Sequence, residues 1–190
     1  MKHIDINEIL KFSESLKPEG MNSTYFKSYS SFIKYFSEKD VLTEDDLIIG
    51  ANFTYGWMPT ILKFKSDNFS DSVKILNKAK LSDRISKDEI LELKSMINNS
   101  LVGVSKLLHF INPDVYAIWD SKVCDFLIGK SHKYLIEDVS RYFEYLDLCL
   151  QITSEPKFKE AHANASKAIG YEISSLRLVE LFMFFGKERR

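Results

Sequence analysis

Residues that interrupt regular structure are rare in this sequence. It holds 7 Gly and 4 Pro among 190 residues, too few for the many turns of a β-sandwich. Apolar residues instead recur at three- and four-residue steps, as at Tyr25, Tyr29, Phe32 and Phe36, and this spacing gathers them on one face of a helix. The sequence therefore predicts an all-α protein.

Capping residues and breakers indicate where these helices begin and end. Thr43 with Asp46, and Ser86 with Glu89, have the spacing of a capping box. Gly129 has the place of a residue just beyond a helix end, and Gly56 predicts a bend after which the helix restarts. Four of the expected helices are given by their starts, near residues 5, 43, 69 and 86. The others are given by their ranges, 25–37, 104–111, 120–127, about 135–149, 158–169 and 172–185.

Length and charge limit the kinds of partner. A chain of 190 residues forms one folding unit, residues 1–190. The net charge is −1 and the pI about 6.4, so bulk charge does not draw the protein to nucleic acid or anionic lipid, and any nucleic-acid site must be a local patch. Between Lys63 and Lys87 there are seven basic and three acidic residues. This stretch either follows a phosphate backbone or is a solvated helix face.

Cysteine usage and hydropathy favour a soluble, cytoplasmic protein. Cys124 and Cys149 lack metal-site spacing and lie in apolar helical patterns, which predicts free buried thiols. The first 17 residues have no apolar core of a signal peptide, and no run approaches the roughly 18 apolar residues of a membrane span. We expect no membrane partner, no metal and no cofactor.

The most informative stretch is SLVGVSKLLHFINPDVYAIWDSKV, residues 100–123. Gly103 is expected to form a tight turn between two helices, the second starting at about Val104 and ending before Pro113. A short extended segment, VYAIW, then leads to Asp120, which opens the next helix. Helical spacing puts Val104, Leu107, Leu108 and Ile111 on a core stripe, and Lys106, His109 and Phe110 on another face.

This order of elements resembles the helix-hairpin-helix DNA glycosylase superfamily, over about residues 88–127. The family has a hairpin of the type L-P-G-V-G-x-K, then a helix, then a segment of the type P-x-x-x-D-x-x-V with the catalytic aspartate. SLVGVSKLLHF corresponds to the hairpin and YAIWDSKV to the aspartate segment. Leu101 or Val102 stands for the hairpin proline and Val104 or Ser105 for the second glycine. No four-cysteine pattern follows, which excludes the subfamilies with an iron–sulfur cluster.

The resemblance implies a two-lobed helical bundle with a cleft between the lobes. Residues 40–128 would form the hairpin lobe, and 1–39 with 129–190 the second lobe. The implied activity is cleavage of the N-glycosidic bond of a damaged or modified base in DNA, with a phage-type modified base among the candidates, in repair or antiviral defence. Asp120 falls on the catalytic aspartate, and Lys106 on or near the amine nucleophile of members that also nick the strand. Gly103, Ser105 and Lys122 would contact DNA.

The chemistry also follows from the residue types. Breaking an N-glycosidic bond develops positive charge on the sugar, which a carboxylate at Asp120 would stabilise. A desolvated Lys106 would be partly deprotonated and could attack the sugar carbon, giving a Schiff base; otherwise it binds phosphate.

A second stretch, NFTYGWMP at residues 52–59, has the composition of a pocket for an extruded base. Aromatic faces stack on a base and an amide reads its edge, which makes Asn52, Tyr55 and Trp57 candidate readers. His109 and Trp119 are further candidates for substrate contact.

Structural alternatives account for the same residues. Asp120 can be a helix cap only, Lys106 a solvated lysine, His109 a packed histidine and the aromatic residues part of the core. The chain would then be a non-catalytic DNA-binding domain or a helical protein-interaction domain.

Overall fold

The computed structural model describes residues 1–17, 24–58, 60–81 and 84–186. In these ranges the chain is helical, with no strand and one isolated antiparallel bridge, between Phe64 and Ile97. The all-α prediction is confirmed. The helices are α1 (Ile6–Glu14), α2 (Thr24–Ser37), α3 (Glu44–Trp57), α4 (Ser70–Lys80), α5 (Lys87–Met96), α6 (Leu101–Ile111), α7 (Ser121–Ile128), α8 (Lys133–Ile136), α9 (Val139–Thr153), α10 (Phe158–Ile169) and α11 (Ser175–Phe185).

The predicted caps are present. Asp5 accepts a hydrogen bond from the Asn7 backbone N–H at the start of α1. Both predicted capping boxes form, at the start of α3 and of α5. Gly129 ends α7 with φ 76°, a left-handed conformation that glycine adopts without steric cost.

The predicted bend at Gly56 is wrong. Helix α3 continues through Gly56 to Trp57, and the described residues between Trp57 and Ser70 form no further helix. Gly56 lies exposed in the last turn, where a glycine costs a helix little because the helix is about to end. Pro59, the last residue of the stretch 52–59, lies outside the described residues.

The tight turn lies earlier than predicted. Asn98 and Asn99 have φ 54° and 50°, the left-handed region that Asn tolerates better than most residues. Ser100 then caps α6 by accepting a hydrogen bond from the Gly103 backbone N–H at 3.2 Å. Gly103 is therefore inside the first turn of α6, where a Cβ atom would overlap the Tyr55 hydroxyl.

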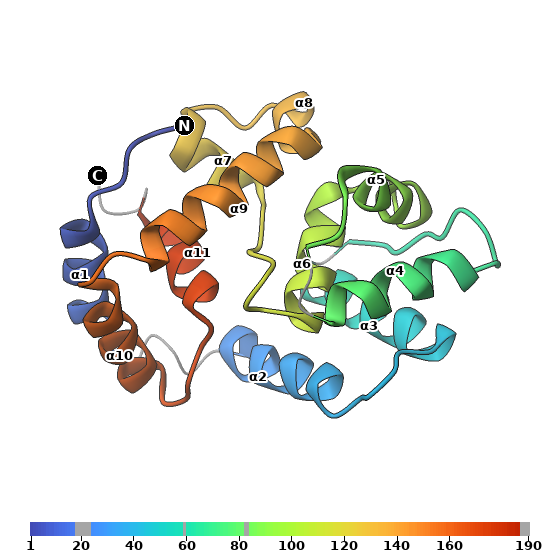
Figure 1. The fold of residues 1–190 in the computed structure, drawn as a ribbon, viewed down its shortest axis with the longest axis horizontal. Coiled ribbons are helices and arrows are strands. Elements are labelled where there is room, and N and C mark those ends of the chain that lie inside the picture. Colours follow the sequence, from blue (N-terminus) through green and yellow to red (C-terminus); the bar gives the residue numbers. More distant parts are fainter. Residues whose placement is uncertain (18–23, 59, 82–83, 187–190) are drawn as a thin grey trace.

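The helices pack in two neighbouring groups around α6 and α11 (Figure 1). Helix α6 contacts α2, α3, α4 and α5, while α11 contacts α1, α7, α9 and α10. Helix α5 also packs against α9, which joins the two groups. Helix α2 packs mainly against α6 and α3, and α7 mainly against α11 and α8. The lobe boundaries at 40 and 128 stay a prediction.

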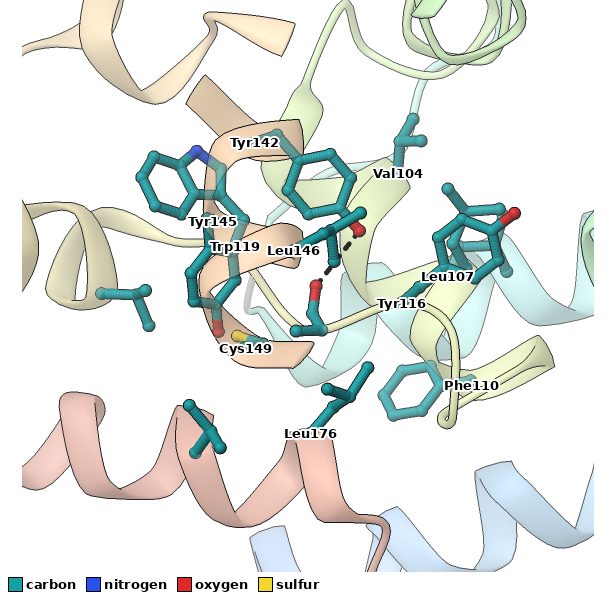
Figure 2. Packing of buried hydrophobic residues seen from close by; sticks show 14 of the residues in the cluster. Val104, Leu107, Phe110, Tyr116, Trp119, Tyr142, Tyr145, Leu146, Cys149 and Leu176 are labelled. Carbon is teal, nitrogen blue, oxygen red and sulfur yellow. Dashed lines mark hydrogen bonds between the residues drawn. The ribbon is translucent and has the colours of Figure 1, made fainter. Parts of the chain in front are cut away.

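One continuous core runs through both groups. Helix α6 is buried on nearly every side. His109 and Phe110, which were expected on a face separate from the core stripe, therefore lie in the core, and Lys106 on the same face stays partly exposed. The extended segment 115–119 covers part of that face, because Trp119 bonds to Ser105 and the Tyr116 carbonyl oxygen to His109. Figure 2 shows side chains from both groups in this core, among them Val104 and Phe110 of α6 and Tyr145 and Cys149 of α9. Cys124 and Cys149 are free and buried, as predicted.

None of the described helices is long and apolar enough to cross a membrane.

Candidate functional site

Four charged side chains meet where α6, α7 and α11 come together. They are Lys106 of α6, Asp120 at the start of α7, and Arg177 and Glu180 of α11, and we call them the charge cluster. Asp120 is 8% exposed, Arg177 1% and Glu180 0%. Charged groups are seldom so deeply buried unless they are paired, which makes this cluster the strongest candidate for a functional site.

Asp120 is the N-cap of α7. Its Oδ1 accepts hydrogen bonds from the backbone N–H groups of Lys122 at 2.9 Å and Val123 at 3.0 Å. These bonds fix the carboxylate, and the helix N-terminus stabilises its negative charge. The cap interpretation is confirmed. It also provides the fixed carboxylate that the chemical interpretation requires.

Lys106 extends from α6 over the indole of Trp57, with Nζ 5.5 Å from the ring centroid. Burial lowers the pKa of its amine, while the negative charges of Asp120 and Glu180 act in the opposite direction. The net direction is downward. Lys106 is therefore a partly buried amine that lies within range of the negative charge of the predicted catalytic aspartate.

Ser105 ties the Lys106 region to the Asp120 region. Its Oγ accepts a hydrogen bond from the Trp119 backbone N–H at 3.1 Å and lies 3.0 Å from the Trp119 carbonyl oxygen, to which it can donate. Ser105 immediately precedes Lys106 in the sequence, and Trp119 immediately precedes Asp120. Ser105 thus fixes the spacing of α6 and the aspartate segment. Ser105 and Gly103 are both buried.

Arg177 and Glu180 form an ion pair inside the protein. One guanidinium nitrogen donates to Glu180 Oε2, and the other terminal nitrogen donates to the Tyr25 hydroxyl at 3.2 Å. The Arg177 guanidinium also lies over three aromatic rings, with its Cζ 4.7 Å from the centroid of Tyr29, 5.4 Å from that of Tyr25 and 5.6 Å from that of Trp57. This arrangement combines a charge-assisted hydrogen bond with cation–π contacts.

Burial opposes the charged forms of both Arg177 and Glu180, but it prevails only for Glu180. Burial raises the pKa of Glu180 to about 7, although Arg177 acts to lower it. For Arg177, burial opposes the charge, but Glu180, Tyr25 and Tyr29 together outweigh burial, so the pKa of Arg177 rises. Glu180 Oε1 is buried and has no hydrogen-bond partner among the described residues, which is uncommon for a buried carboxylate oxygen.

Sequence reasoning missed this pair. In SLRLVELFMFF the two residues stand three apart in an otherwise apolar helix, so they share the face that packs against the core. Two opposite charges at this spacing on an apolar helix were the available signal. Only the fold could bring them to Lys106.

His109 is a structural residue of this site. Its Nδ1 lies 2.6 Å from the Tyr116 carbonyl oxygen and its Nε2 2.7 Å from the Tyr29 hydroxyl. The carbonyl requires a donor, so Nδ1 carries the hydrogen and Nε2 accepts from Tyr29. Burial, followed by the nearby charge of Arg177, lowers the pKa of His109 to about 3. The ring is neutral and holds Tyr29 against Arg177.

Of the three candidate base readers, the structure brings Trp57 to the charge cluster. Its ring stacks on Tyr25, with centroids 4.1 Å apart and planes 9° apart. Tyr55 is buried with its hydroxyl 3.5 Å from the Ile97 carbonyl oxygen, beside Gly103. Asn52 is exposed and donates to the Ile48 carbonyl oxygen at 2.8 Å.

The remaining candidates lie near the cluster or on the surface. Trp119 is buried, its Nε1 donates to the Ile136 carbonyl oxygen at 2.8 Å and its ring lies against Tyr145. Lys122 is exposed, with Nζ 4.0 Å from the centroid of Phe184. In the basic stretch between Lys63 and Lys87, several charges are already paired: Lys74 with Asp71, Lys78 with Glu89 and Arg84 with Asp147.

A cavity of about 320 Å³ is lined mainly by Tyr29, Ile33, Pro113, Tyr171 and Ser174. Tyr29 also contacts Arg177, so this residue borders both the cavity and the charge cluster.

Within the described residues, no three His, Cys, Asp or Glu side chains gather in a way that could hold a metal ion. No protein-family model, no curated protein and no solved structure matches this chain. The chemistry of the site must therefore be argued from its geometry: a partly buried amine, a fixed carboxylate and an aromatic face, held at one place by three helices.

Proposed function

We propose that this protein is a DNA glycosylase in which Lys106 is the amine nucleophile and Asp120 the catalytic carboxylate. The observation that carries the proposal is the position of Lys106, partly buried over Trp57, where the negative charge of Asp120 acts on its amine. Both residues were singled out by sequence order, 14 positions apart (120 − 106 = 14). An amine and a carboxylate in one partly desolvated site are the groups that N-glycosidic cleavage with Schiff-base formation needs.

The local architecture supports the proposal. Helices α5 and α6 pack against each other and are joined by the short turn at Asn98 and Asn99, and the chain then breaks near Pro113 and returns at Asp120 to start α7. This is the order helix, turn, helix with lysine, break and aspartate on which the family resemblance rests. The turn precedes Lys106 by more residues than the hairpin motif has.

The proposed reaction begins with an uncharged Lys106. Its Nζ lone pair attacks C1′ of the sugar, a bond forms between Nζ and C1′, and the bond from C1′ to the base nitrogen breaks. The base leaves with the bonding electrons and takes up a proton. Asp120 stabilises the positive charge that develops on the sugar. Loss of a proton from the linked nitrogen and opening of the sugar ring give a Schiff base, from which strand nicking follows by elimination.

The substrate would be an extruded damaged or modified base, with a phage-type modified base as one candidate. Trp57 and Tyr25 provide aromatic faces on which a base can stack. Because these two rings stack on each other, the base enters only if they separate. We propose that the two helix groups correspond to the two lobes of the family and that the cleft opens between them at this point.

Borohydride trapping tests the amine chemistry. Duplexes carrying abasic sites, oxidised or alkylated bases, or phage-derived modified bases are incubated with the protein and borohydride, and covalent complexes are separated on denaturing gels. Wild type should form a complex with at least one duplex, and Lys106→Ala should form none. Lys159→Ala, which changes an exposed lysine of α10, should trap like wild type.

An enzyme that uses water instead of the amine forms no trapped complex. Base release measured without borohydride would detect such an enzyme. Asp120→Asn should then lower the release rate by a factor of at least about 100, as expected when an electrostatic stabiliser of the transition state is lost. If wild type binds duplex DNA at low salt but releases no base from any duplex, the protein is a non-catalytic DNA-binding domain. If it neither binds DNA nor releases a base, the protein-interaction alternative stands.

A further inference from the structure

The buried pair on α11 has no role in the chemistry proposed so far. Arg177 and Glu180 are inside the protein, and replacing such a pair with apolar residues is often neutral or stabilising. One oxygen of Glu180, Oε1, has no hydrogen-bond partner among the described residues. Because Glu180 is buried with this oxygen unpaired in the described part of the chain, stability alone does not explain why a carboxylate stands at this position.

The position of the pair relative to Lys106 indicates that role. The Lys106 amine and the Arg177 guanidinium lie at similar distances from the Trp57 ring, 5.5 Å and 5.6 Å from its centroid. Glu180 is bonded to Arg177, which brings its carboxylate into the same buried region. The charge of Glu180 is accordingly attracted by that of Lys106 and repelled by that of Asp120.

We propose that Glu180 sets the charge of Lys106: the ionised carboxylate holds a proton on the amine, and the amine becomes a free nucleophile more readily when that negative charge is removed. Glu180 is thus a positioning residue that acts through Lys106. Its importance for catalysis rests on the proposed function, but its effect on the amine does not.

The groups around Glu180 give the effect its sign. Arg177 and Lys106 are positive, and Asp120 is negative. Removal of Glu180's charge leaves Lys106 beside an unopposed Arg177, so the ammonium form becomes less favourable. The other titratable groups with an electrostatic contact to Glu180 are Tyr25, Tyr29, Tyr145 and Cys149, on α2 and α9. Burial raises the pKa of each, which keeps them neutral over the pH range in which a lysine amine titrates.

Competitive acylation of Lys106 tests this without DNA. The protein is treated with a trace of acetic anhydride at a series of pH values from 6 to 11, and mass spectrometry of the peptide that contains Lys106 gives the pH at which half of the amine is reactive. In Glu180→Gln this midpoint should fall by about one pH unit relative to wild type, the order expected for loss of one charge at partly screened, short range. Lys159 in the same samples should keep its midpoint.

A second variant covers the possibility that Glu180→Gln does not fold, since it leaves Arg177 without its partner. The double variant Arg177→Met, Glu180→Gln buries no lone charge. Its Lys106 midpoint should again fall below that of wild type, by less than in the single variant, because Glu180 acts on Lys106 more strongly than Arg177 does. A midpoint equal to or above that of wild type in whichever of these variants folds would overturn the proposal.

The two proposals fail in different ways. A midpoint shift with neither a trapped DNA complex nor base release leaves Glu180's effect on Lys106 in place and removes the glycosylase. Trapping at Lys106 without a midpoint shift supports the glycosylase and contradicts the proposed effect of Glu180 on Lys106.

Discussion

At the scale of single residues, the site depends on side chains that do two tasks at once. Asp120 caps a helix and presents a carboxylate to Lys106. Ser105 bonds both to Trp119 and to the Val102 carbonyl oxygen of its own helix. His109 bonds to Tyr29 and Tyr116, and so holds Tyr29 near Arg177. In each case a hydrogen bond within the core fixes a group that faces the charge cluster, which is how a protein keeps reactive side chains in one geometry.

Ser105→Ala tests the tie between α6 and the aspartate segment. The substitution leaves the Trp119 backbone N–H buried without its partner, which should lower the free energy of unfolding by about 1–2 kcal/mol. It should also reduce the trapping rate if the enzyme proposal holds. Urea denaturation gives the first value and borohydride trapping the second. Ser95→Ala, which removes an exposed hydroxyl from α5, is the matched control and should change neither.

The neutral state of His109 predicts how stability depends on pH. Its pKa is about 3 in the folded protein against 6.5 ordinarily, so between these values the unfolded chain binds a proton that the folded protein does not. Stability from this residue is complete above about pH 6.5 and decreases as the pH falls toward 3, by up to about 4 kcal/mol. Urea denaturation at pH 4, 5, 6 and 7 should show a shallower dependence in His109→Gln than in wild type. Parallel curves would contradict a buried neutral histidine.

At the scale of elements, helix boundaries were predicted where a capping residue determines them and missed where tertiary contacts do. Thr43, Ser86 and Asp120 begin helices because their side chains bond to nearby N–H groups, a relation that sequence alone contains. The turn at Asn98 and Asn99 was assigned to Gly103 because a glycine is the usual sign of a turn. That glycine instead permits close approach of Tyr55, which only the packed structure reveals.

The difference between local sequence patterns and tertiary contacts also explains which residues of the site could be predicted. Lys106 and Asp120 belong to one local stretch, so their order could be compared with a motif. Arg177 and Glu180 reach them from α11, more than 50 residues later in the chain. No local pattern links that helix to α6, and their burial depends on how the two helix groups pack.

Two substitutions at Asp120 separate its task in the helix from its task in the chemistry. Asn caps helices nearly as well as Asp, so Asp120→Asn should lower the free energy of unfolding by less than about 1 kcal/mol, whereas Asp120→Ala loses the cap and should cost about 1–2 kcal/mol. Base release should be lost in both. Denaturation curves and release assays on the same preparations compare the two effects. Full release by a folded Asp120→Asn protein would leave Asp120 as a cap only.

At the scale of the whole molecule, the two helix groups share one core and are also joined near the surface. Glu137, between α8 and α9, accepts a hydrogen bond from the Leu101 backbone N–H at 2.9 Å and pairs with Lys94 of α5 at 3.0 Å. Helix α5 packs against α9 at the same place. A site built across two groups keeps its geometry only if the groups do not unfold separately, so the shared core bears directly on the charge cluster.

The two tryptophans test this directly, because Trp57 belongs to α3 in one group and Trp119 packs against Tyr145 of α9 in the other. Trp119→Phe leaves Trp57 as the single fluorophore, and Trp57→Phe leaves Trp119. A continuous core predicts that, in each variant, the fluorescence transition in urea coincides with loss of helix measured by circular dichroism. The two variants will differ in midpoint, since each loses different contacts, so the comparison is made between probes within one variant. If Trp57 fluorescence changed at a lower urea concentration than the circular dichroism did, the group around α6 would be unfolding first. The two groups would then be separable units, and Lys106 could move away from Asp120 and Glu180 while α11 stayed folded.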